Sequence, residues 1–81
     1  MKNVVKLGPV EMYEHEAAAA YAAGKYLVTY KTVYQIHFSQ AQGWHYATPV
    51  YSSTVPLAKR GRFHLLTGKE INTLIGHDLL N

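Results

Sequence analysis

The sequence contains no cysteine, few prolines and few charged residues, and each of these shortages excludes a class of protein. Without cysteine there is no disulfide scaffold and no metal site with thiolate ligands. The longest strictly apolar stretch, Ala17 to Ala23, is far below the roughly 18 residues of a membrane helix. The first residues also lack the apolar core of a signal peptide. We therefore expect a cytoplasmic protein without a membrane partner.

Acidic residues are missing from the whole middle of the chain. No Asp or Glu occurs between Ala17 and Lys69, whereas six Lys and Arg residues do. A segment with charge of one sign favours an acidic partner surface or nucleic acid. It also argues against a protein that mimics DNA through a negative surface.

The composition is that of a single small folded domain, residues 1–81. A chain of 81 residues can build only one modest core. Hydrophobic residues make up 48% of the sequence and charged residues 16%, which argues against disorder.

Two helices are predicted, one near each end. Gly8-Pro9, three glutamates and an alanine-rich run predict a helix that starts at Pro9 and ends at Gly24. Thr67 and Glu70 form a capping box that starts the second helix. Its apolar stripe is Ile71, Leu74, Ile75 and Leu79, and Gly76 can end it early.

The residues between the helices have the two-residue period of strands. The first predicted strand runs unbroken from Tyr26 to Phe38. Its tyrosines are expected to face the core or, alternatively, to form a face that stacks on bases or binds a protein. Because seven tyrosines are more than so small a core can satisfy, we expect at least two of them to be exposed and usable for binding. A turn over Ser39–Gly43 leads to a second strand, Trp44 to Tyr51, and Pro49 indicates that this strand lies at an edge or is interrupted there. A third extended segment covers Leu57 to Leu66 and bends at Lys59–Arg62.

The predicted fold class is therefore α+β in the order αβββα. A small antiparallel three-stranded sheet carries both helices on one face, and a short strand at Val4 to Leu7 can add a fourth. This order resembles that of double-stranded-RNA-binding domains. The family's basic cluster is absent, because the second helix opens Gly68-Lys69-Glu70-Ile71 with a single lysine. The family's Gly-Pro-x-His strand-loop signature is absent as well, because Gly8-Pro9 lies before the first helix. The resemblance is confined to the order of elements.

Catalytic and metal-binding patterns are absent, so we expect a protein that is not an enzyme and uses no cofactor. Six residues separate Gly61 from Gly68, and Glu70 follows the lysine, so this is no phosphate-binding loop. Glu11 and His15 have helical spacing for a shared metal, but no third ligand accompanies them. The serines lie outside any nucleophile elbow.

The predicted binding residues combine the basic bend with the aromatic residues of the strands. Arginine and aromatic residues dominate interface energies, and arginine binds carboxylates and phosphates with two hydrogen bonds. The predicted partner-binding residues are Lys31, Lys59, Arg60, Arg62, Trp44, Tyr46 and Tyr51.

These features predict a non-enzymatic protein that binds and occludes an acidic protein surface or a nucleoprotein complex. The chain is similar in size and composition to inhibitors of host defence carried by phages and mobile elements, including anti-CRISPR proteins, which act in the bacterial cytoplasm. One alternative is a nucleic-acid-binding module that uses the basic bend and the hairpin aromatics. Another is a structural protein that forms homo-oligomers through an exposed edge strand near Pro49.

Overall fold

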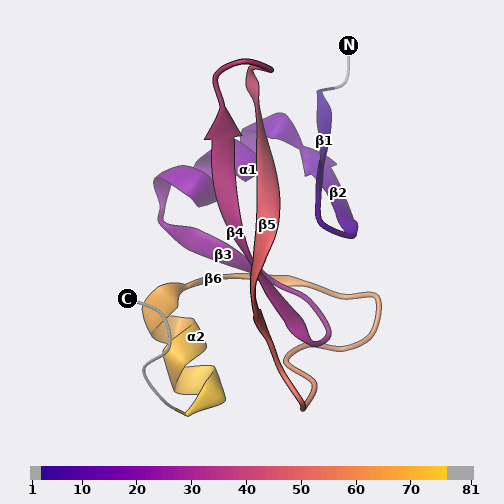
Figure 1. Ribbon diagram of the computed structural model, residues 1–81, viewed down its shortest axis with the longest axis vertical. Helices are drawn as coiled ribbons and strands as arrows, with labels where there is room; N and C mark the ends of the chain where they lie inside the picture. The colour runs from indigo at the N-terminus through magenta and orange to yellow at the C-terminus, as the bar shows by residue number, and fades with distance from the viewer. Residues whose placement is uncertain (1–2, 77–81) are drawn as a thin grey trace.

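The computed structural model describes residues 3–76, which form an α+β fold with a two-stranded and a four-stranded antiparallel sheet (Figure 1). Neither helix in this part of the chain is long and apolar enough to cross a membrane. In chain order, the elements are β1 (Val4–Leu7), β2 (Val10–Tyr13), α1 (Glu14–Ala22), β3 (Lys25–Val28), β4 (Thr32–Ser39), β5 (Trp44–Ser52), β6 (His64–Thr67) and α2 (Gly68–Ile75).

The N-terminal segment forms a β-hairpin where the sequence predicted the start of a helix. The strand at Val4–Leu7 is confirmed, but it pairs with β2 and not with the larger sheet. Gly8 and Pro9 form the two-residue loop between them, and Gly8 has the positive φ of 61° that suits the first position of a type II′ turn. The predicted helix start at Pro9 is therefore wrong, and α1 begins only at Glu14.

The long strand predicted from Tyr26 to Phe38 is two strands, β3 and β4, which pair antiparallel with each other. The chain reverses over residues 29–31. The Thr29 amide and hydroxyl both donate to the Thr32 carbonyl, at 2.8 and 2.9 Å. Since this threonine closes the turn, neither glycine nor proline is needed, and the two-residue period continues through the reversal.

The four-stranded sheet has the order β5-β4-β3-β6. The turn predicted before Trp44 is confirmed, and β5 lies at one edge as Pro49 indicated. The predicted third extended segment is strand only over its last part, His64–Thr67, where it pairs with β3. The remainder belongs to a loop of residues 53–63, called here the β5–β6 loop.

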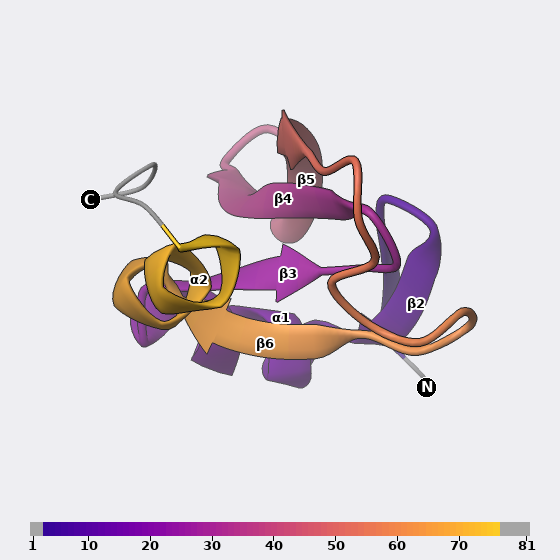
Figure 2. The same cartoon turned by 90° about the horizontal axis from the view of Figure 1, so that it is seen from below.

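The two helices cover opposite faces of the sheet, which contradicts the prediction that both lie on one face. In Figure 2, α2 passes in front of the sheet and α1 lies behind it. On the α1 face, the alanines Ala17 and Ala20 pack with Leu27, Ile36 and residues of the β1–β2 hairpin.

The second core lies on the α2 face and contains Val28, Val33, Leu57 and Ile71. Because Leu27 and Val28 are neighbours in β3, their side chains point to opposite faces, and both are fully buried. The sheet therefore separates two small cores that the sequence alone suggested to be one.

Helix α2 begins as predicted and ends at Gly76. The Glu70 amide donates to the Thr67 hydroxyl at 3.2 Å, and the Thr67 amide donates to the Glu70 carboxylate at 2.9 Å, which confirms the capping box. Gly76 ends the helix with a φ of 84°. Ile71 is fully buried, but Leu74 is 49% exposed, so its predicted role in docking the helix is wrong. The predicted contact of Leu79 lies outside the described residues.

Candidate functional site: a basic cleft beside Tyr30

The β5–β6 loop folds back onto the turn between β3 and β4. The Ser53 amide donates to the Lys31 carbonyl and the Leu57 amide to the Tyr30 carbonyl, both at 2.7 Å. The Leu57 side chain is buried in the second core. These contacts fix a loop that has no regular secondary structure in a defined position against the sheet.

The bend predicted in this loop is present and exposed. The Arg62 amide donates to the Lys59 carbonyl at 3.0 Å, and Gly61 between them has a positive φ of 74°. Lys59, Arg60 and Arg62 are all exposed, so their charged groups are available to a partner.

Tyr30 joins the bend to the β3–β4 turn. The Arg60 guanidinium carbon lies 4.6 Å from the centre of the Tyr30 ring, and the Lys31 Nζ lies 5.4 Å from it. Both distances are within the range of cation–π attraction. Cations from two separate parts of the chain therefore form one surface, called here the basic surface, which consists of Lys31, Lys59, Arg60 and Arg62.

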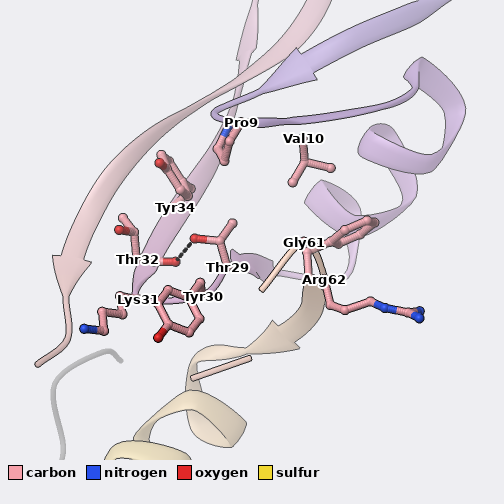
Figure 3. Close-up of a pocket in the computed structure, with 10 residues that line it drawn as sticks. Pro9, Val10, Thr29, Tyr30, Lys31, Thr32, Tyr34, Gly61 and Arg62 are labelled. Carbon is pink, nitrogen blue, oxygen red and sulfur yellow. Dashed lines mark hydrogen bonds between the residues drawn. The ribbon is translucent and has the colours of Figure 1, made fainter. Parts of the chain in front are cut away.

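A cleft with a volume of about 420 Å³ lies between this turn, the β1–β2 hairpin and the bend. Figure 3 shows Tyr30, Tyr34 and Pro9 around it, with Lys31 and Arg62 at its rim. A neighbouring hollow of about 430 Å³ shares Arg62 and Phe63 with the cleft. The full lining of the cleft is Pro9, Val10, Thr29, Tyr30, Lys31, Thr32, Tyr34, Gly61, Arg62 and Phe63.

The charges of the basic surface are not neutralised by the described part of the chain. Over residues 3–76, no carboxylate forms an ion pair with any of its four cations. Two of the described carboxylates are engaged elsewhere, because Glu14 pairs with His45 and Glu70 caps α2. Within residues 3–76, the surface therefore presents a positive field that no ion pair neutralises.

The structure divides the residues predicted for binding into two groups. The four cations come together, but Trp44 and Tyr46 lie toward the opposite end of the β4–β5 hairpin. Trp44 is separated from Ser52, at the end beside Lys31, by eight residues of β5, or roughly 27 Å of strand. The predicted single site of cations and aromatic anchors is therefore not formed.

Tyr51 is also placed elsewhere than expected. It is half-buried and packs against the second core, so it contributes to stability more than to an exposed surface.

Different aromatic residues accompany the cations, and they are not among the predicted partner-binding residues. Tyr30 and Tyr34 belong to the predicted strand 26–38, whose tyrosines were expected in the core or in an alternative binding face, and no role was predicted for Phe63. Phe63 is 41% exposed. Its position directly after the basic bend is a sequence signal that could have predicted an aromatic residue beside the cations. The position of Tyr30 beside these cations could be predicted only by recognising the turn at Thr29.

At the far end of the hairpin, exposed aromatic residues form a second, uncharged group. Tyr46 stacks on His37 with a centroid distance of 5.1 Å, and the His37 Nε2 lies 2.8 Å from the Thr48 hydroxyl. Trp44 and Tyr46 are both exposed, as are Tyr13 and Tyr21. The expectation that at least two tyrosines are exposed is thus confirmed.

The Glu14–His45 pair has the chemistry of a catalytic dyad but the surroundings of a structural contact. The Glu14 carboxylate accepts hydrogen bonds from the His45 ring at 2.6 Å and from its amide at 2.9 Å. The rings of Tyr21 and Phe38 lie about 5 Å from the imidazole, and His45 is only 7% exposed. The pair fastens the start of α1 to β5.

Glu11 and His15, considered for a shared metal, lie on different elements. Glu11 is on β2 opposite Lys6, and His15 is on α1, where its ring stacks on Tyr13. The helical spacing on which that idea depended does not exist. Within residues 3–76, no three side chains of His, Asp or Glu lie close enough to hold a metal ion.

The edge of β5 that does not pair with β4 is obstructed at several positions. The His45 amide is used by Glu14, Pro49 has no amide, and a bulge interrupts the pairing of β4 and β5 at Val50. Such features prevent an edge strand from pairing with another chain. They disfavour the alternative of oligomerisation through this edge.

Comparison with models of protein families, with curated proteins and with solved structures finds no match. The function is therefore argued from the site itself.

Proposed function

We propose that the protein is a non-enzymatic binding protein that occludes an acidic surface of its partner through the basic surface around Tyr30. The observation that carries this proposal is the docking of the β5–β6 loop onto the β3–β4 turn. It gathers cations with which no carboxylate of residues 3–76 forms an ion pair. Because backbone hydrogen bonds hold the loop, little ordering entropy is lost on binding. A partner surface covered by this domain is closed to its usual ligands, as with small phage-borne inhibitors.

A nucleic acid is the second candidate, favoured by the exposed Phe63 ring beside Arg62. Positively charged grooves with aromatic side chains bind single strands by stacking and by phosphate contacts. Salt dependence separates the two candidates. Binding to nucleic acid falls steeply as the salt concentration rises, whereas binding to a protein through fewer charges falls less.

The test is capture of partners from a bacterial lysate by the parent and by two charge-reversal variants. One carries Lys59→Glu with Arg62→Glu, and the matched control carries Lys6→Glu with Lys69→Glu, which changes the net charge equally at exposed positions elsewhere. The partner should be retained by the control and lost by the first variant, which should melt at nearly the parental temperature. Equal capture by both variants would place the binding surface elsewhere.

A further inference from the structure

The cleft beneath the basic surface has a floor of a different chemistry from its rim. Pro9 and Val10 from the β1–β2 hairpin, together with Tyr34 and Phe63, present mostly carbon atoms. The Thr29 hydroxyl already donates to the Thr32 carbonyl at 2.9 Å, as the dashed line in Figure 3 shows. This threonine therefore offers no free donor to a ligand, and the interior of the cleft suits an apolar group.

The cations at the rim do not converge on one point. In Figure 3, the Lys31 side chain extends away from the cleft on one side and the Arg62 side chain on the other. Arg60 is held against the Tyr30 ring. A single phosphate binds best where several donors point at the same position. Separated cations fit a ligand whose negative charges are also separated, with an apolar part between them.

We infer that the cleft binds an extended acidic segment of the partner protein, with one apolar or aromatic side chain inserted among Tyr30, Tyr34 and Phe63. Acidic residues on either side of this anchor would meet Lys31 and Arg62. The inference rests on the proposed function and names the part of the partner that is recognised.

Size and interface energetics agree with this assignment. The volume of about 420 Å³ lies in the lower part of the range for ligand pockets, roughly 300–1,000 Å³. A single anchor in a pocket, surrounded by charged contacts, is the usual arrangement of an energetically dominant interface residue.

The test uses a fluorescein-labelled peptide, GDEFEDG, in a fluorescence anisotropy titration. Two further peptides, GDESEDG and GKKFKKG, remove the aromatic anchor and reverse the charges, respectively. The first peptide should bind at least tenfold more tightly than either, because a buried phenylalanine side chain contributes roughly 1.5–3 kcal/mol. Equal binding of the phenylalanine and serine peptides would overturn the inference, as would the absence of binding of GDEFEDG at millimolar concentration.

Two protein variants locate the peptide. Phe63→Ala removes one wall of the cleft and should weaken binding of GDEFEDG by about fivefold or more. Val55→Ala is the matched control, because Val55 is an exposed apolar residue of the same loop that does not line the cleft. Equal affinities of the two variants for the peptide would also overturn the inference.

The same variants separate this inference from the proposed function. If the Lys59→Glu, Arg62→Glu protein loses the captured partner while Phe63→Ala keeps it, the basic surface binds without the cleft. That result refutes the inference about the cleft and leaves the proposed function standing. If neither change affects capture, both proposals fall. If a ten-nucleotide thymidine strand binds more tightly than GDEFEDG and Phe63→Ala abolishes that binding, the cleft binds nucleic acid and the inference is overturned.

Discussion

Replacing Gly8 by alanine should destabilise the protein clearly more than replacing Gly24 by alanine. The two glycines have similar positive φ values, 61° and 69°. An alanine at either position is therefore subject to the strain of a positive φ, about 1–2 kcal/mol. Their surroundings differ, so comparing the two variants measures the cost of packing a methyl group at position 8.

A Cβ atom at Gly8 would lie 2.8 Å from Cε2 and Cζ of the Tyr34 ring, whereas one at Gly24 would meet no atom within 4 Å. Tyr34 is half-buried and packs against the first core, which restricts the movement of its ring. Such overpacking costs about 1–3 kcal/mol. We therefore expect Gly8→Ala to lower the free energy of unfolding by about 2–5 kcal/mol, and Gly24→Ala by about 1–2 kcal/mol.

Urea denaturation of both variants, followed by circular dichroism, measures the difference. For a domain of this size, each kcal/mol corresponds to roughly 4–8 °C in melting temperature, so thermal melts give a second readout. Combining Gly8→Ala with Tyr34→Ala should reduce the penalty at position 8 to that at position 24, because the clash is then relieved. Equal unfolding free energies of the two single variants would refute the packing of the hairpin turn against Tyr34.

Three further predictions concern the two cores and the second helix. Ile71→Ala should lower the free energy of unfolding in urea by about 2–5 kcal/mol, because Ile71 is fully buried. Leu74→Ala, at a half-exposed position, should lower it by about 1 kcal/mol or less. The reverse order would show that α2 docks differently. Glu14→Ala should cost about 1–3 kcal/mol because it removes the acceptor of both His45 hydrogen bonds, and an unchanged melting temperature would contradict this. The Thr67 amide, with a smaller contribution from its hydroxyl, holds the pKa of Glu70 below its ordinary value of 4.5. The capping stability is therefore present above that pH and lost as the pH falls through the lowered folded value, so the parent and Glu70→Gln should become equally stable in acid; a pH-independent difference would refute the assignment.

The sequence predicted best those features that depend on neighbouring residues. The capping box at Thr67 and the edge position of the strand containing Pro49 both depend on local chemistry, and both are present. The start of the first helix was placed too early, because Gly8-Pro9 suits a helix start and a hairpin loop equally well. The alternating pattern of the residues on either side, Val4–Leu7 and Val10–Tyr13, is the local signal that favours the hairpin.

The arrangement of the elements depends on long-range contacts and could not be predicted. A strand with apolar residues at consecutive positions, as at Leu27 and Val28, can be buried on both faces, but only the position of α2 shows that it is. Charge alone identified the cations of the basic surface, since the missing acids are visible in the sequence. Their aromatic neighbour Tyr30 depends on a turn closed by a threonine, for which no composition rule exists.

The burial of β3 on both faces also determines how the protein unfolds. Its four residues pair with β6 on one side, and residues 26–28 pair with β4 on the other. Its side chains belong to both cores. Neither core can open without exposing this strand, so the two halves should melt as one cooperative unit. The amide hydrogens of Leu27 and Val28 should accordingly exchange with solvent only through global unfolding. Tyr30 and Lys31 of the basic surface belong to the turn that follows β3, so this surface is anchored to the most stable strand of the molecule.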